Sequence, residues 1–542
     1  MKLFTSLLFC LYVMTLSAVP AKKERYTLHL ADGTTVEATA MGDETMHYFQ
    51  TDDGRHLQCD SLGIAHYVEI DNLLKHQKAR SLKRQATLAK RFASRQRKSE
   101  RSLIGSKPGL VILVQFPQTP FRYTNADFQR LFNERGYTDN INIGSVRDYF
   151  LNASYRQFDF TFDVVGPVTV SQPLSFYGAN NDNGDDQHPA VMVAEAVQLV
   201  NDKVDFKKYD WDGDGEVEQI FIIHSGFDEA QNTSQPNNIW SHAWTLTEAL
   251  DENDGEGPIM ADGVVIDSYA TSAELHGNSN INAKIAGIGI ACHEFSHCFG
   301  LPDFYNTQGY SSGMNSWDLM DFGEYNGNGG APAGFTSYER MFCGWLQPTE
   351  LVEPIVVQNM PALTSEPVAY ILRNSGKADE YYLLENRQQE GWDSGLAGHG
   401  LLILHVDYDS QAWAENTVNT FPSPQRMTII PADNTLYSST LAGDPWPGTS
   451  GNTELSDITT PAAKLFNKNA EGDYLMHHSI SEISESDKGL ISFTFDEGTS
   501  GIMSPSTSAE EGLYYNLSGL KVSQDYKGIV IKNGKKTFIH NP

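Results

Sequence analysis

One run of eleven residues, HEFSHCFGLPD from His293 to Asp303, combines residue types at spacings that suit a catalytic metal. Two histidines four residues apart on a helix lie on the same face, so both imidazoles can bind one ion. Zinc in hydrolytic enzymes takes three protein ligands and leaves a fourth position for water, whose pKa it lowers. Glu294, next to the first histidine, can take the proton of that water. The run therefore predicts zinc-dependent hydrolysis with His293 and His297 as ligands.

Asp303 is the predicted third ligand. Gly300 has no Cβ, so it can end the helix in the left-handed conformation and turn the chain back towards the metal. Pro302 then prevents the helix from resuming. The alternative is a buried helix with two ordinary histidines, because short HExxH strings also arise by chance. The full pattern, together with the segments that follow it, favours the metal site.

The segment NSWDLMD, residues 315–321, follows the predicted zinc helix. It resembles the methionine turn of metzincins, in which a methionine side chain packs beneath the zinc, and Met320 is the matching residue. An ordinary core methionine is the alternative, since this soft side chain fits irregular apolar space.

The runs GIACHEFSHCFGLPDFY, WDLMDFGEYNG and GFTSYERMFCGWL together resemble the immune inhibitor A family of secreted bacterial metallopeptidases. The resemblance covers about residues 105–495, because GSVRDYFLNASYRQFDFTFDVVGPVTV and YYLLENRQQEGWDSGLAGHGLLILHVDYD resemble the family as well. It implies an α/β (α+β) metzincin-like catalytic domain, zinc bound by His293, His297 and Asp303, and Glu294 as general base or acid.

One position departs from the metzincin pattern. Some metzincins stabilise the transition state with a tyrosine two residues after the methionine, and here that residue is Phe322. Tyr325 and Tyr305 are the alternatives for this role.

Composition indicates a soluble chain of several domains. The 542 residues are 40% apolar and 20% charged, with a net charge of −30. Residues 1–104 hold 16 basic and 11 acidic residues, so the negative charge lies in the remainder. We predict the following segments: a signal peptide at 1–18, a β-rich propeptide at 19–104, the catalytic domain at 105–348, a β-sandwich-type accessory region at 349–497, a linker at 498–512 and a β tail at 513–542.

The tail resembles the C-terminal sorting domains by which some Gram-negative bacteria move proteins across the outer membrane. This resemblance implies the outer-membrane secretion machinery as a partner and a secreted, extracellular or cell-surface location. No stretch after the signal peptide is long and apolar enough to predict a transmembrane span.

Hydrophobic patterning predicts the elements that position the site. Strands are expected at 110–116, 160–170 and 219–224, and helices at 145–152 and 189–202. The stretch 263–270 is expected to be an edge strand along the cleft, to which an extended substrate could add by main-chain pairing.

A basic stretch, residues 75–101, joins the propeptide to the catalytic domain. Basic runs can mark nucleic-acid binding, but in a secreted precursor we favour a protease-sensitive connector and expect no nucleic-acid partner. A solvated amphipathic helix that stays attached is the alternative.

The propeptide needs a group that silences the zinc. A thiolate is a strong zinc ligand, so Cys59 is one candidate, although the sequence favours an ordinary, partly buried thiol at this position. The carboxylates of Asp52, Asp53 and Asp60 are the alternatives.

A second metal site is predicted in the run DWDGDGEVE, residues 210–218. Carboxylates at loop positions 1, 3 and 5 and glycine at position 6 follow the geometry of calcium loops. Position 12 is Phe221 and a strand-like run follows, which favours a structural calcium loop over a sensor. An acidic surface turn is the alternative. The candidate ligands are Asp210, Asp212, Asp214, Glu216 and Glu218.

Three cysteines lie in the catalytic domain: Cys292, Cys298 and Cys343. The first two are too far apart on a helix to form a disulfide with each other. Either could pair with Cys343, or all three could be free thiols.

Two classes of function fit the sequence. The first is a secreted zinc endopeptidase, made as a zymogen, that hydrolyses proteins or peptides. The second is a non-catalytic, calcium-binding surface adhesion protein built on a metallopeptidase scaffold. The presence of Glu294 favours the enzyme.

Overall fold

The computed structural model describes residues 19–44, 46–60, 62–73, 75, 103–181, 184–277, 281–307, 313–420 and 424–497, together with four short strands between 514 and 539. The predicted signal peptide, most of the basic connector and the predicted linker at 498–512 lie outside the described residues. Within the part of the chain that the structure describes, no helix is both long and apolar enough to cross a membrane.

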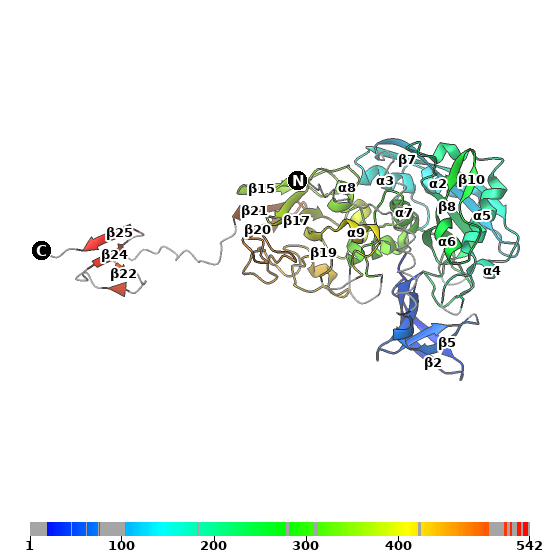
Figure 1. The fold of residues 1–542 in the computed structure, drawn as a ribbon, viewed down its shortest axis with the longest axis horizontal. Coiled ribbons are helices and arrows are strands. Elements are labelled where there is room, and N and C mark those ends of the chain that lie inside the picture. The colour runs from blue at the N-terminus through cyan, green and yellow to red at the C-terminus, as the bar shows by residue number, and fades with distance from the viewer. Residues whose placement is uncertain are drawn as a thin grey trace, which may run out of the picture.

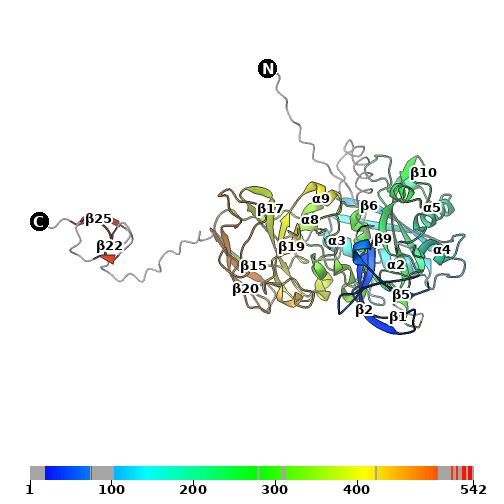
Figure 2. The same cartoon turned by 60° about the horizontal axis from the view of Figure 1, so that its bottom comes forward.

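The N-terminal region folds into a small closed β-barrel. Its strands are β1 (Arg25–Leu30), β2 (Thr35–Asp43), β3 (Met46–Thr51), β4 (His56–Cys59) and β5 (Ile64–Val68). Figures 1 and 2 show this barrel in blue against one side of the larger body. Its apolar core continues into that body, because it includes Trp240 and Ile290.

The predicted catalytic domain, called the catalytic region below, is built on a mixed sheet with strand order β13-β12-β8-β6-β7, in which β9 also pairs with β12. Strands β7, β6, β8 and β12 run parallel to one another, and β9 and β13 pair antiparallel with β12. The strands are β6 (Gly105–Gln115), β7 (Phe158–Thr169), β8 (Ile220–Phe227), β9 (His242–Thr245), β12 (Ser268–His276) and β13 (Lys284–Ile285). A separate two-stranded sheet pairs β10 (Ile259–Ala261) with β11 (Val264–Ile266).

Helices surround this sheet. They are α2 (Asn125–Asn133), α3 (Val146–Ala153), α4 (Leu174–Gly178), α5 (Pro189–Val200), α6 (Leu246–Asp251), α7 (Gly289–His297) and α8 (Ser337–Phe342). The predicted helices at 145–152 and 189–202 correspond to α3 and α5. A capping box joins Ser145 and Asp148 at the start of α3, which satisfies two backbone donors that a helix end leaves open.

The three predicted strands are confirmed as β6, β7 and β8, but the expected edge strand at 263–270 is wrong. That stretch is divided between β11 and β12, and β12 lies inside the sheet, between β8 on one side and β9 and β13 on the other. Its residues 268–275 are all buried, so the apolar pattern reflects an interior strand.

The C-terminal region contains two further sheets, with strand orders β14-β16-β17-β18-β19 and β15-β21-β20. The strands are β14 (Thr349–Glu350), β15 (Ile355–Met360), β16 (Tyr370–Asn374), β17 (Lys377–Arg387), β18 (Gly400–Asp407), β19 (Met427–Ile429), β20 (His478–Glu485) and β21 (Ile491–Glu497). A short helix, α9 (Ser410–Ala414), follows β18. In the tail, β22 (Tyr514–Asn516), β23 (Lys521–Val522), β24 (Gly528–Lys532) and β25 (Lys535–Ile539) form a four-stranded sheet.

The five-stranded sheet packs on both faces, as the alternation of side chains along a strand allows. On β17 and β18, Leu383 and Leu404 belong to the core of the catalytic region. Their neighbours Leu384 and Ile403 belong to a second core, shared with β20 and β21. In Figure 1, β17 accordingly lies between α8 and the strands β15, β20 and β21. The catalytic region and the β-rich region therefore share a continuous core across position 348.

Candidate metal centre

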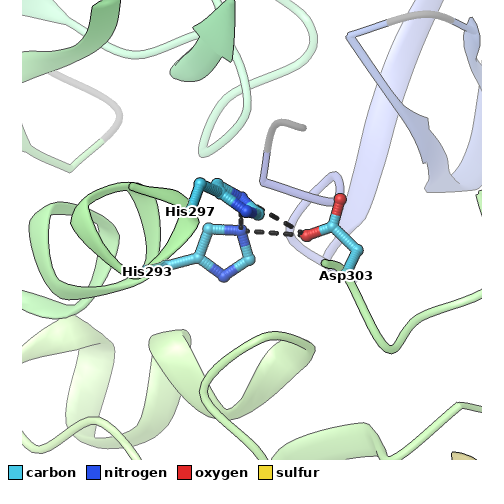
Figure 3. A group of neighbouring side chains, drawn as sticks. All are labelled: His293, His297 and Asp303. Carbon is cyan, nitrogen blue, oxygen red and sulfur yellow. Dashed lines mark hydrogen bonds and ion pairs between the residues drawn. The ribbon is translucent and has the colours of Figure 1, made fainter. Parts of the chain in front are cut away.

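Helix α7 carries three of the predicted site residues, and all nine of its residues are buried. The helix ends at His297, with Cys298 as its C-cap, and Gly300 adopts φ +98°, the left-handed conformation that the sequence predicts. The chain then turns back, so Asp303 faces the two histidines in Figure 3.

Three side-chain atoms converge in front of α7. The two Nε2 atoms of His293 and His297 lie 3.2 Å apart. Asp303 Oδ1 lies 3.2 Å from the first Nε2 and 3.6 Å from the second. Ligands of a tetrahedral ion with bonds of about 2.0 Å are separated by about 3.3 Å. The three atoms therefore have the spacing that one metal ion requires, and these residues form a group that could hold one.

The outer nitrogens of the two histidines fix their tautomers. Nδ1 of His293 donates to the carbonyl oxygen of Leu319 at 2.8 Å, and Nδ1 of His297 donates to that of Leu301 at 2.9 Å. Because a carbonyl only accepts, each Nδ1 carries a proton, and Nε2 is the ring nitrogen left to bind a metal. Two ring nitrogens and a carboxylate oxygen thus face one another, an arrangement that a cation between them stabilises.

Glu294 lies beside this group. Its Oε2 is 4.0 Å from Nε2 of His297, and the side chain is buried. Neither of its carboxylate oxygens accepts a hydrogen bond from the described residues. Burial, and then the charges of Glu324 and Asp303, raise the pKa of Glu294 well above its usual range.

Two residues that no motif indicated also belong to the centre. Glu324, in the 3-10 helix η3 (Phe322–Gly329), places Oε2 3.7 Å from Nδ1 of His293. Burial, followed by the charge of Asp303, raises the pKa of Glu324 as well. Asn416, from the β-rich region, donates through Nδ2 to Oδ2 of Asp303 at 2.8 Å. Neither residue stands at a recognisable spacing from the histidines, so the sequence offers no signal for them.

Met320 is fully buried, next to the Leu319 carbonyl that accepts from His293. The backbone N–H of Met320 donates to Oδ1 of Asp318 at 2.8 Å, which fixes the turn. Tyr325, one alternative for the missing tyrosine, donates through its hydroxyl to the carbonyl of Pro20 at 2.8 Å. The hydroxyl of Tyr325 therefore binds a backbone carbonyl of the N-terminal region.

The candidate latency residues named from the sequence do not join the three metal-binding atoms. Cys59 lies on β4, where burial and the charges of Glu229 and Asp60 raise the pKa of its thiol to about 12. Asp52 and Asp53 form ion pairs with arginines at the surface, and Asp60 pairs with a histidine. Cys59 and the three cysteines of the catalytic region form no disulfide bonds with one another.

The predicted calcium loop is partly assembled. Carboxylate oxygens of Asp210, Asp212 and Glu218 lie within 4.8 Å of one another, whereas Asp214 and Glu216 are outside this group. Asp210 accepts hydrogen bonds from the backbone N–H groups of Gly213 and Gly215 at 2.8 and 3.0 Å, which closes the loop. As the sequence predicts, the chain continues into β8.

Comparison with known proteins supports a metallopeptidase. Residues 115–347 match the family model described as immune inhibitor A peptidase M6, catalytic domain. A pre-pro-metalloprotease, PrtV of Vibrio cholerae serotype O1, is 26% identical over 275 residues, which cover 43% of this chain and 29% of that protein. Immune inhibitor A of Bacillus thuringiensis subsp. alesti is 24% identical over 276 residues, covering 43% of this chain and 39% of the relative. The chain therefore matches well under half the length of these relatives, and residues 115–347 are similar to the catalytic domain of the immune inhibitor A-like M6 metallopeptidases.

Proposed function

We propose that this protein is a zinc-dependent endopeptidase, made as a zymogen, that cleaves protein or peptide chains. The observation that carries the proposal is the convergence of His293 Nε2, His297 Nε2 and Asp303 Oδ1 at separations of 3.2 to 3.6 Å. Imidazole and carboxylate ligands in a set of three suit a catalytic zinc ion, which retains one position for water. When bound, zinc supplies the positive charge that activates a water molecule and polarises the scissile carbonyl.

Glu294 moves the proton in this proposal. As a carboxylate it takes a proton from the attacking water, and as the resulting acid it gives the proton to the nitrogen of the leaving amine. Its position supports both steps, because it follows His293 on α7 and lies 4.0 Å from the Nε2 of His297. Met320 would form the floor beneath the metal, and Tyr325 or Tyr305 would donate to the oxyanion.

Latency is supported by the burial of the centre. His293, Glu294, His297 and Asp303 are at most 2% exposed, so a protein substrate has no access to them while the N-terminal region is in place. Burial is the main cause of the raised pKa of Tyr305 and of Glu294, and the charge of Glu44 raises both further. Asp43, at the end of β2, also raises the pKa of Tyr305, so the end of β2 lies near the centre. In Figure 3 the pale blue ribbon of this region runs beside Asp303.

The first described residues extend this cover. The indole N–H of Trp240 donates to the carbonyl of Val19 at 3.0 Å, and the backbone N–H of Lys22 donates to that of Ala230 at 2.9 Å. The ring of His47 stacks on Trp240 with centroids 4.6 Å apart. We infer that cleavage in the basic connector, 75–101, releases the N-terminal region and opens the centre. The carboxylates of Asp43, at the end of β2, and Glu44, in the turn after it, fit the blocking role better than Cys59, whose raised pKa keeps it a thiol.

Export is part of the same proposal. A signal peptide at 1–18 would direct the chain out of the cytoplasm, and the tail at 513–542 would engage the outer-membrane secretion machinery. The four-stranded sheet of β22 to β25 is compatible with a separate tail domain. The protein would then act outside the cell or at its surface.

We also propose that the loop at 210–218 binds a structural calcium ion. The support is the group of Asp210, Asp212 and Glu218 oxygens, since calcium prefers carboxylate and carbonyl oxygens. The loop directly precedes β8 in the chain, and β8 lies in the middle of the catalytic sheet, so a bound ion would stabilise the centre of that sheet.

Element-resolved mass spectrometry of the purified full chain tests both metal sites. We expect one zinc and one calcium per chain. His297→Ala should lose the zinc and keep the calcium, whereas Asp212→Asn should lose the calcium and keep the zinc, so each variant is the control for the other. A folded His297→Ala variant that binds zinc as well as the wild type would refute the zinc assignment, and calcium retained by Asp212→Asn would refute the calcium loop.

A further inference from the structure

The ligand Asp303 is held by a residue that lies outside the segment matched by the peptidase family. The backbone N–H of Asp303 donates to Oδ1 of Asn416 at 2.7 Å, and Nδ2 of Asn416 donates to Oδ2 of Asp303 at 2.8 Å. Because a backbone N–H must face an acceptor, the amide of Asn416 can have only this orientation. The two hydrogen bonds clamp both the backbone and the carboxylate of the ligand.

This clamp selects which oxygen meets the metal. With Oδ2 bonded to the amide, Oδ1 is the oxygen that points between the two histidine nitrogens, at 3.2 and 3.6 Å. A carboxylate rotates freely about its last bond unless a donor fixes it. The amide donates without bringing a charge, so it orients Asp303 and leaves the negative charge of the carboxylate for the metal.

Asn416 is itself held in place by the β-rich region. It follows α9 with φ +50°, a left-handed conformation that asparagine tolerates better than most residues. Close by, Nδ2 of Asn419 donates to the carbonyls of Phe304 and Met427 at 2.7 and 2.6 Å. The ring of Trp413 lies 6.3 Å from that of Phe304. These contacts hold the loop after α9 against Phe304, the residue that directly follows Asp303.

We propose that Asn416 is a positioning residue of the metal centre, and that the β-rich region thereby completes a site whose ligands all lie in the catalytic region. The family match ends at residue 347, so this part of the site comes from a different segment of the chain. The inference rests on the proposed function, because it assumes that Asp303 binds a metal.

The test is the zinc affinity of the full chain, measured by competition with a chromogenic chelator. Asn416→Gly removes the amide and accepts the left-handed backbone. Asn434→Gly is the matched control, because Asn434 also has a positive φ, +58°, but is exposed and apart from the metal ligands. We expect zinc affinity to fall by about tenfold to hundredfold in Asn416→Gly, the usual effect of removing a partner of a metal ligand, and to stay unchanged in Asn434→Gly.

Equal zinc affinity of wild type and Asn416→Gly would overturn the positioning role, while tight binding by the wild type would leave the proposed function standing. Absence of zinc binding by the folded wild type would remove both. If Asn416→Gly does not fold, Asn416→Asp keeps the size and the acceptor but replaces the donor. The visible absorption spectrum of its cobalt(II) form should then differ from that of the wild type, and an identical spectrum would overturn the proposal.

Discussion

Replacing Glu294 by glutamine is expected to abolish peptide-bond hydrolysis while the metal stays bound. Glutamine keeps the size of the side chain but cannot take a proton from water, and positioned acid–base groups contribute about 10²- to 10⁴-fold to the rate. Glu294 supplies none of the three converging ligand atoms, so its replacement leaves His293, His297 and Asp303 able to bind the metal. The measurement is kcat on a denatured protein substrate after release of the N-terminal region, beside the zinc content.

Glu256→Gln is the control for this variant, because Glu256 is an exposed glutamate on the same region of the chain. It should retain wild-type kcat. A Glu294→Gln protein that contains zinc and cleaves at the wild-type rate would show that another group moves the proton. Glu324 would then be the next residue to replace, since it is the other buried carboxylate beside His293.

Replacing Arg387 by leucine is expected to lower the free energy of unfolding by about 3–5 kcal/mol, because it leaves buried carboxylates without their partner. The guanidinium is fully buried and binds Asp393 through two bonds of 2.7 and 2.6 Å and Glu385 through one of 3.0 Å. Burial alone would lower the pKa of Arg387, but these carboxylates raise it well above its usual value.

The same guanidinium connects β17 to the loops around the metal centre. It donates to the carbonyls of Trp317 and Gly334, both at 3.1 Å. Arg373→Leu is the control, because Arg373 is partly exposed and its one ion pair among the described residues, with Glu350 at 3.6 Å, is of the surface kind that contributes at most about 1 kcal/mol. Its other contacts are a hydrogen bond to the carbonyl of Ala378 at 2.8 Å and the ring of Tyr381. Chemical denaturation compares the two variants. A change below about 1 kcal/mol in Arg387→Leu would contradict a structural role for this cluster.

Local sequence was enough to predict that the three candidate metal ligands converge. His293, His297 and Asp303 lie within eleven residues, and one helix followed by a left-handed glycine brings them together. Helix periodicity and the conformational freedom of Gly300 are properties of short segments, so they can be inferred without knowledge of the rest of the fold. The same reasoning predicted the capping box of α3 and the strands β6, β7 and β8.

Contacts between distant segments were beyond the reach of such patterns. Asn416 meets Asp303 across 113 positions, and Arg387 reaches Trp317 across 70. Neither contact leaves a periodic signal, because it depends on how the five-stranded sheet packs against the catalytic region. The stretch 263–270 was mistaken for an edge strand for a related reason: apolar residues do not show which strands will cover them.

The N-terminal region shows the same limit. Its single cysteine, Cys59, was a candidate zinc ligand from the sequence. In the structure it is instead the turn after β2 that approaches the centre, where the charge of Glu44 adds to the effect of burial in raising the pKa of Glu294. A turn carboxylate has no sequence signature, and its position depends on how the barrel docks on Trp240 and Ile290.

The most direct test of the central claim is hydrolysis of a denatured protein by the full chain before and after limited trypsin treatment, with and without a zinc chelator. We expect no cleavage by the intact chain, cleavage once the connector at 75–101 has been cut and the N-terminal region removed, and loss of that cleavage with the chelator until zinc is restored. Cleavage that persists in the zinc-free protein would contradict the account. So would a folded, zinc-loaded, processed protein that cleaves nothing, and this outcome would favour a non-catalytic binding protein.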